Sequence, residues 1–377
     1  MIIKSLSIRN FRNIASADFI FDPKVNIFTG NNAQGKTNLC EAISVCFGKS
    51  FRNPKTSELL PFGSQDNETA VEMCFTFDNM PEKENTVIYT QKNSSFDLKF
   101  NGIGMKDAEE LYGALRYVLF IPEDLYIVKG EPEKRRGYID FVSNMINRVH
   151  NIKLYEYNKA LRQKNNILIN MSGYDKNASL MLESWNETLA KLGVNVMCGR
   201  IRYFDMLAAG AKIYYSMLNN NSEILDVKYE SSVMKDISFT ADDHIMMYET
   251  YLTRLRESAE RELRMKYTVV GAHRDDVSFY INNMPAKDFG SQGQIRSIAV
   301  ALKLAEAGMI TEKSGDVPII ILDDVLSELD EFRRGFIINH IDKFQIFITS
   351  CNLSDTEKFE SGKIWNVNHG KFELRGA

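Results

Sequence analysis

The chain opens with short runs in which apolar and polar residues alternate. The clearest run is Ile-Ile-Lys-Ser-Leu-Ser-Ile at residues 2–8, and polar turns separate it from those that follow. The later runs cover residues 17–21, 25–29, 70–77, 86–89 and 96–100. A period of two is typical of strands that bury one face. The pattern therefore predicts an N-terminal part rich in β-strands.

The hydrophobic period then becomes helical, from roughly residue 134 to 219. Two apolar faces carry this signal: Leu154, Tyr157, Leu161 and Leu168, and then Leu182, Trp185, Leu189 and Leu192. Another helical run spans about 246–264, and two buried strands follow at 317–322 and 345–349. We expect an α/β fold, with a mixed sheet and flanking helices. Residues 1–125 and 267–377 would form one head, and residues 126–266 would form a mainly helical inserted arm.

Composition fits a protein able to bury a sizeable core, since 44% of the 377 residues are hydrophobic and 25% are charged. The formal net charge of −4 excludes a globally basic nucleic-acid coat but leaves room for a local basic face. No apolar run approaches the ~18 residues of a membrane span, and the N-terminus lacks a secretory signal. The five cysteines include no C-x-x-C pair. We therefore expect reduced thiols and a cytoplasmic protein with no membrane partner.

A phosphate-loop motif, G-x-x-x-x-G-K-[ST], lies between an apolar strand and an amphipathic helix. Its residues are Gly30, Asn31, Asn32, Ala33, Gln34, Gly35, Lys36 and Thr37. The glycines let backbone N–H groups turn around phosphate oxygens, and the helix N-terminus adds partial positive charge. In this pattern the lysine reaches the β- and γ-phosphates and the threonine hydroxyl ligates Mg²⁺. The segment therefore predicts a nucleotide site.

The strand at 317–322 ends in two carboxylates, Asp323 and Asp324. A strand this apolar lies inside a parallel sheet, so its acids emerge at the carboxyl end, where α/β proteins bind ligands. Asp323 would hold Mg²⁺ through a water molecule, and Asp324 would polarise the attacking water. The alternative is a plain strand-end turn, in which Asp is common.

Two further segments narrow the class of protein. Ser291-Gln292-Gly293-Gln294 stands directly before an apolar helix, and its hydroxyl and backbone donors suit phosphate. Ser327-Glu328-Leu329-Asp330 follows the acid pair. Read separately, these segments are equally well an N-cap and a polar turn. Together and in this order they indicate an ABC-type ATPase head.

With these motifs the sequence resembles the RecF family of bacterial DNA replication and repair ATPases, relatives of the SMC-type ATPases. The match covers essentially the whole chain. It also rests on Ile8–Asn13, Phe-Ile-Pro-Glu-Asp-Leu at 120–125, Gly130-Glu131-Pro132, and Gly-Ala-His-Arg-Asp-Asp at 271–276.

The resemblance implies ATP and Mg²⁺ as cofactors and an ATP-dependent homodimer. Lys36 and Asp323 of one chain would face Ser291 and Gly293 of the other across ATP, and Arg12 would approach the phosphates. Thr349-Ser350 stands where many ABC proteins carry a switch histidine. A hydroxyl cannot carry charge, so we expect hydrolysis to be slow, and the resemblance implies that DNA stimulates it.

Membership of this family implies DNA binding, mediators of the RecR and RecO type, and a role in gap repair, stalled-fork repair and the SOS response. Basic candidates for DNA contact are Lys134, Arg135, Arg136, Lys153, Lys159, Arg162, Lys164, Arg254, Arg256, Arg261, Arg264 and Lys266. Interleaved glutamates make intrahelical ion pairs an equal alternative for the last five. Trp185, Tyr155 and Tyr157 are expected in the core. The alternative function is that of a phage-defence-type or other SMC-like ABC ATPase not dedicated to recombination.

Overall fold

The structure is a computed structural model that describes residues 1–48, 50–52, 56–61, 68–92, 95–105, 111, 115–171, 176–235, 238–352, 359 and 362–376. The chain divides into two compact units, and each is described by itself. The first unit combines Met1–Asp124 with Lys303–Ala377, and the second is Leu125–Leu302.

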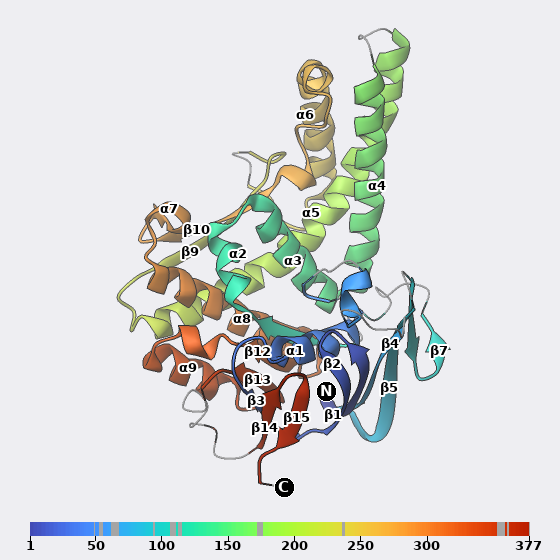
Figure 1. The fold of residues 1–377 in the computed structure, drawn as a ribbon. Helices are drawn as coiled ribbons and strands as arrows, with labels where there is room; N and C mark the ends of the chain where they lie inside the picture. Colours follow the sequence, from blue (N-terminus) through green and yellow to red (C-terminus); the bar gives the residue numbers. More distant parts are fainter. Residues whose placement is uncertain are drawn as a thin grey trace. The chain divides into compact units, whose positions relative to one another are not determined.

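The first unit contains a six-stranded sheet in the order β15-β14-β3-β13-β12-β8 (Figure 1). Its strands are β3 (Val25–Thr29), β8 (Tyr117–Phe120), β12 (Ile319–Asp323), β13 (Ile346–Ser350), β14 (Lys363–Asn368) and β15 (Lys371–Leu374). All pairs are parallel except β14 with β15. Every residue of β3, β12 and β13 is buried. Burial on both faces explains why these strands read as continuous apolar runs.

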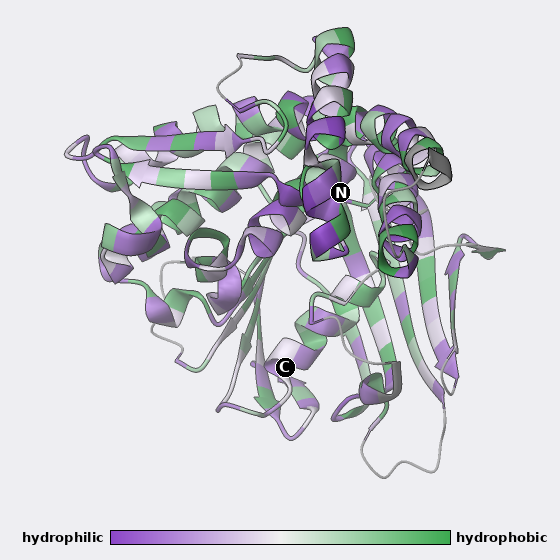
Figure 2. Ribbon diagram, turned by 90° about the horizontal axis from the view of Figure 1, so that it is seen from above, coloured by the Kyte–Doolittle hydropathy of each residue, from purple (hydrophilic) through white to green (hydrophobic). Residues whose placement is uncertain are grey.

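A second, antiparallel sheet of the first unit has the order β2-β1-β4-β5-β6-β7. Its strands are β1 (Ile2–Phe11), β2 (Ile14–Ile20), β4 (Glu68–Phe77), β5 (Met80–Lys92), β6 (Ser95–Phe100) and β7 (Ile103–Gly104). Hydrophilic and hydrophobic bands alternate along its long strands in Figure 2, as the period of two predicts. Helix α1 (Lys36–Val45) packs against β12 and β13 of one sheet and against β1 and β4 of the other. The residues after the phosphate-loop lysine are thereby held from both sides.

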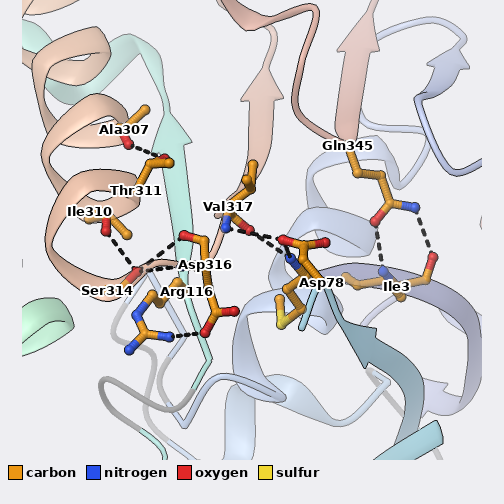
Figure 3. Close-up of polar contacts among 11 residues, drawn as sticks. Ile3, Asp78, Arg116, Ala307, Ile310, Thr311, Ser314, Asp316, Val317 and Gln345 are labelled. Atoms are coloured by element: carbon orange, nitrogen blue, oxygen red, sulfur yellow. Dashed lines mark hydrogen bonds and ion pairs between the residues drawn. The ribbon is translucent and has the colours of Figure 1, made fainter. Parts of the chain in front are cut away.

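Polar contacts join distant segments at the starts of these strands (Figure 3). The Gln345 side chain accepts from the Ile3 N–H at 2.7 Å and donates to the Ile3 carbonyl at 2.8 Å. Asp78 accepts from the Val317 N–H at 3.1 Å, and Arg116 pairs with Asp316 at 2.8 Å. The contacts of Val317 and Asp316 fix the start of β12, whose far end carries the acid pair.

The remaining elements of the first unit are short, apart from one helix near the acid pair. They are the 3₁₀ turns η1 (Thr56–Leu59), η3 (Pro122–Leu125, which ends in the second unit) and η5 (Leu326–Glu328), and α9 (Glu331–Ile341). The Asp330 carboxylate accepts from the Arg333 N–H and caps α9. Ser327-Glu328-Leu329-Asp330 is therefore a turn that leads from the acid pair into this helix.

The second unit is mainly helical and also contains a small sheet. Its helices are α2 (Tyr126–Lys129), α3 (Pro132–Ile146), α4 (Arg148–Asn170), α5 (Lys176–Leu218), α6 (His244–Met265) and α7 (Ala286–Phe289), and α8 (Gln292–Ser314) begins here. The 3₁₀ turn η4 spans Ala272–Arg274. Apolar residues of α4, α5 and α6 form one buried cluster, so the predicted helical faces are confirmed for Tyr157 and Leu189. Tyr155, expected in the core, is 58% exposed, so that prediction is wrong.

The three-stranded sheet β11-β10-β9 was not foreseen from the sequence. Strand β9 (Leu225–Glu230) pairs with β10 (Asp276–Ile281), which pairs with β11 (Met284–Pro285). By their contacts residues 267–302 belong to the second unit, whereas the predicted division assigned them to the head. The division into an ATPase head and an arm remains a prediction. None of the helices in the described part of the chain has the length and apolarity of a membrane span.

Candidate nucleotide-binding site

The phosphate loop connects β3 to α1 and depends on two glycines. Gly35 has φ +115°, a conformation that side chains disfavour, and a Cβ there would lie 2.8 Å from Asn13 Oδ1. A Cβ on Gly30 would lie 2.3 Å from the Val367 carbonyl oxygen. The Gln34 carbonyl accepts from the Gly370 N–H at 2.8 Å. Both glycines are therefore required by the close packing of the loop against neighbouring backbone and side chains.

Lys36, the first residue of α1, is 5% exposed and folds back over the loop. Its Nζ donates to the Gly30 carbonyl at 2.6 Å and to the Asn31 carbonyl at 3.0 Å. A third contact joins it to Cys351 Sγ at 3.4 Å. The ammonium group is thus held at the mouth of the loop by acceptors of low charge, which a phosphate oxygen can replace.

The predicted metal pair, Thr37 and Asp323, is brought together. Thr37 Oγ1 donates to Asp323 Oδ1 at 3.0 Å, and Thr349 Oγ1 donates to the same oxygen at 2.7 Å. Burial raises the pKa of Asp323 above its ordinary value, and the two hydroxyl bonds oppose that rise.

These oxygens fit Mg²⁺. Mg²⁺ prefers oxygen ligands and keeps several waters, and the Thr37 hydroxyl and the Asp323 carboxylate place two such oxygens side by side. Among the described residues no group of three or more His, Cys, Asp or Glu side chains forms a metal site. A hydroxyl and one carboxylate agree with an ion that takes most of its ligands from phosphate and water.

Asp324 follows with a left-handed backbone, at φ +56°. Its N–H donates to Thr349 Oγ1 at 2.9 Å, so one threonine fixes both acids. Both carboxylate oxygens of Asp324 lie 3.7 Å from Cys351 Sγ. Because Cys351 also contacts Lys36, one thiol joins Asp324 to the phosphate-loop lysine.

Cys351 is the site residue that sequence reasoning missed at the end of β13. The prediction singled out Thr349-Ser350, but both residues are fully buried: Thr349 holds the acids and Ser350 Oγ donates to the Asn352 carbonyl. The next residue contacts Lys36 and Asn32 instead. Side chains alternate between the two faces of a strand, so residue 351, two positions after Thr349, is expected on the same face as Thr349. This alternation is the signal in the sequence that points to Cys351.

Arg12 is held by a buried carboxylate on α1. Its Nε and Nη2 donate to the two oxygens of Glu41, each at 2.9 Å, and Glu41 is 0% exposed. Arg52 Nη1 lies 3.5 Å from the same carboxylate and donates to Asn38 Oδ1 at 3.0 Å. Against the larger effect of burial, the charge of Arg52 lowers the pKa of Asp323. Arg52 therefore belongs to the electrostatic surroundings of the acid pair, and no motif in the sequence marks it.

Ser291 lies in the second unit, where it caps α8. Its N–H donates to Gln294 Oε1 at 2.7 Å, and its Oγ accepts from the Gln294 N–H at 3.2 Å. This reciprocal pair is a capping box. Gly293, also predicted, is half-buried in the first turn of α8 and accepts from Ser297 Oγ at 3.0 Å. The N-cap alternative is thus observed, and the hydroxyl hydrogen of Ser291 is not used by the cap.

Two of the basic residues considered for DNA contact are buried in ion pairs. Arg135 is 5% exposed and donates to both Asp276 oxygens at 2.7 Å. Lys164 is 0% exposed and pairs with Glu262 at 2.7 Å. Buried in these ion pairs, neither side chain is available to DNA phosphates, so these two predictions of DNA contact are wrong. Lys159, Arg162, Arg261 and Arg264 are exposed on α4 and α6.

Most of the Gly-Ala-His-Arg-Asp-Asp segment at 271–276 lies in a buried junction, with Arg274 exposed. His273 Nδ1 lies 2.7 Å from Tyr157 Oη, and Tyr157 Oη lies 2.9 Å from Tyr251 Oη. His273 Nε2 lies 3.0 Å from the Thr268 carbonyl, which can only accept, so Nδ1 accepts from Tyr157. Asp275 is 0% exposed. The motif therefore holds α4 and α6 against the loop before β10.

The fold and the site together define a class. A phosphate loop after one parallel strand, an acid pair at the end of another, and a serine-capped helix are the parts of an ABC-type ATPase head. The predicted fold class is confirmed by similarity to solved heads. One of these is the Smc head bound to the C-winged helix domain of ScpA, with a TM-score of 0.57 and 14% identity over 99% of this chain and 97% of that chain.

The model of the RecF/RecN/SMC N terminal domain matches residues 2–369. A protein of Staphylococcus carnosus (strain TM300) named DNA replication and repair protein RecF is 35% identical over 98% of this chain and 99% of its own length. A solved structure of the recombination mediator protein RecF-ATP in the RecFOR pathway has a TM-score of 0.88 and 31% identity, covering 99% of this chain and 97% of that one. The chain belongs to the RecF family.

Proposed function

We propose that this protein binds ATP and DNA in recombinational repair and replication, and that it acts as an ATP-dependent dimeric clamp. The convergence of Lys36, Thr37, Asp323 and Asp324 on one phosphate loop carries the proposal. The RecF-ATP relative, at 31% identity over nearly the whole chain, supports ATP as the nucleotide. The names of the relatives support repair and replication as the setting.

Each site residue has a role in this proposal. The loop N–H groups and Lys36 bind the phosphates, and Thr37 and Asp323 hold Mg²⁺. When bound, the ion neutralises charge on the phosphates. Asp324 orients the attacking water and accepts its proton, while Arg12 and Arg52 add positive charge near the acids. Turnover is slow in this proposal because the end of β13 and the residue after it carry Thr349, Ser350 and Cys351, and no histidine that could take a charge.

The dimer completes the site in this proposal. Ser291 is exposed and its hydroxyl hydrogen remains for donation to a phosphate of the partner chain. ATP would then close two heads head to tail, and hydrolysis would open them.

The phosphate contacts to duplex or gapped DNA come from Lys159 and Arg162 on α4 and from Arg261 and Arg264 on α6. RecR- and RecO-type mediators and the SOS response belong to the same proposal, and the RecFOR naming of the solved relatives supports the mediators.

Fluorescence anisotropy of a labelled gapped duplex tests the proposal, with and without ATP-Mg²⁺ at near-physiological salt. We expect ATP to strengthen binding at least about tenfold, because closure of a dimer adds a second set of phosphate contacts. Lys36→Ala should remove the ATP effect and leave the nucleotide-free binding. DNA binding that ignores nucleotide, or none at all, would overturn the clamp and favour a defence-type or protein-directed ATPase.

A further inference from the structure

Glu223 lies in the loop that follows α5, and both of its carboxylate oxygens accept hydrogen bonds. Oε1 accepts from Gln294 Nε2 at 2.6 Å, and Oε2 accepts from Tyr215 Oη at 2.6 Å. Its backbone carbonyl accepts from Asn219 Nδ2 at 3.0 Å. Tyr215 is 1% exposed, near the end of α5. Glu223 is thereby fixed to the last turns of the long helix and reaches the first turn of α8.

This contact determines which way the Gln294 amide faces. A carboxylate only accepts, so the group that Gln294 presents to Glu223 must be its NH₂. Its carbonyl oxygen is then turned to the Ser291 N–H, from which it accepts at 2.7 Å. The Gln294 N–H in turn donates to Ser291 Oγ. The Ser291 hydroxyl therefore has a fixed acceptor side, and its hydrogen points elsewhere.

We propose that Glu223 is a positioning residue that orients the Ser291 hydroxyl for the phosphate of a partner chain, and that Tyr215 links this orientation to α5. The inference rests on the proposed ATP-dependent dimer. Helix α5 has 43 residues, about 65 Å at 1.5 Å per residue. A displacement of α5 that moves Tyr215 therefore reaches the Ser291 turn through two short hydrogen bonds.

The chain offers a rescue that a merely structural role would not show. Glu223→Lys presents only donors to Gln294, so either two donors meet at that contact or Gln294 turns its carbonyl oxygen to the lysine and its own NH₂ toward the Ser291 N–H. Adding Gln294→Glu restores one acceptor between two donors, which are the new ammonium group at position 223 and the Ser291 N–H. Gln294→Glu alone places two carboxylates together. The two single variants should therefore be impaired and the double variant repaired.

The test is ATPγS-dependent dimerisation of the full chain by sedimentation velocity, with binding of a fluorescent ATP measured on the monomer. Glu223→Lys should weaken dimerisation about 10- to 100-fold, the value of a charge-assisted hydrogen bond. ATP binding by the monomer should change less than about twofold, because the phosphate loop is untouched. Tyr215→Phe should give a smaller loss, and the double variant should return to within about threefold of wild type.

Each other outcome overturns the inference in a distinct way. If wild type dimerises with ATPγS and Glu223→Lys dimerises equally well, Glu223 does not position Ser291. Equal losses in both single variants and the double variant, tracking their melting temperatures, would show a structural role only. A wild-type protein that binds ATP yet stays monomeric would overturn both this inference and the proposed clamp.

Discussion

Two buried clusters of charged side chains, one in each unit, differ in how their charges are matched. In the first unit Lys36, Asp323 and Asp324 collect at strand ends around one loop, and Lys36 rests on carbonyl oxygens and a thiol. In the second unit the buried Asp140 has matched partners of opposite sign. Arg200 donates to both oxygens of Asp140 at 2.7 and 2.8 Å, and His150 Nε2 lies 2.9 Å from the same carboxylate.

The electrostatics follow this difference. Burial opposes ionisation of Asp140, but Arg200 and the His150 hydrogen bond outweigh it and hold the pKa of that carboxyl well below its ordinary value. For Asp323 the effect of burial is larger than that of its hydrogen bonds, so the pKa of this carboxyl is raised. A buried carboxylate that is paired with a cationic side chain stabilises the fold. A buried carboxylate with too little positive charge around it can instead bind a metal cation. Burial alone therefore does not separate structural from functional charge, but the balance of partners does.

The largest effect should come from a reagent that distinguishes the two units. Cys351 is half-buried beside Lys36, whereas Cys198 of α5 is buried and burial raises the pKa of its thiol to about 11. N-ethylmaleimide should therefore add to Cys351 and abolish ATP binding, because the adduct occupies the space above the phosphate loop. Fluorescent ATP binding measures the loss.

Cys351→Ser serves as the control for this reaction and should still bind ATP after treatment. Prior ATP should also protect wild type. Retention of ATP binding by a protein shown by mass spectrometry to be alkylated at Cys351 would contradict the placement of this thiol in the site.

The next effect concerns the Lys164–Glu262 pair of the second unit. Lys164→Met should lower the free energy of unfolding by about 3–5 kcal/mol, because it leaves Glu262 buried without this counter-charge. Urea denaturation measures this change. The double variant Lys164→Met/Glu262→Leu should recover most of it, since two apolar side chains need no partner. A double variant as unstable as the single one would show that this pair does more than neutralise its own charges.

A pH effect of about 3 kcal/mol on stability should come from His273, at about 1.4 kcal/mol for each pKa unit. Burial lowers its pKa to about 4 from an ordinary 6.5. The unfolded chain therefore binds the proton first, so this contribution to stability is complete above pH 6.5 and is lost as the pH falls toward 4. Nearby Arg274, Arg136 and Lys164 act in the same direction.

Comparison with His273→Gln isolates this contribution, because glutamine does not titrate. Urea denaturation at about pH 7, 5.5 and 4.5 should show a steeper decline for wild type than for the variant. Parallel declines would mean that His273 binds a proton equally well in the folded and the unfolded protein.

Features that are contiguous in the chain could be predicted from the sequence. The phosphate loop, the acids after β12 and the cap at Ser291 are each a short motif between an apolar strand or helix and a turn, so their local geometry follows from their order. Continuous apolar runs likewise identified β12 and β13.

Features that depend on long-range contacts were not predictable. Cys351 lies 315 residues from Lys36 along the chain, and Arg135 lies 141 residues from Asp276. A buried basic residue has the same sequence signature as a solvated one, which is why the predictions for Arg135 and Lys164 were wrong. Strand β9 follows a long helical run in the sequence, and α6 separates it along the chain from its partner strand, β10.

The most direct test of the clamp is the dissociation rate of Asp324→Asn protein from a gapped duplex in ATP-Mg²⁺. An asparagine keeps the shape of the acid but cannot accept the proton of the attacking water. Since ATP would then hold the dimer closed, we predict dissociation at least about tenfold slower than for wild type, and a return to the fast rate when Lys36→Ala is added. Dissociation that is equally fast in wild type, in Asp324→Asn and without nucleotide would contradict the account.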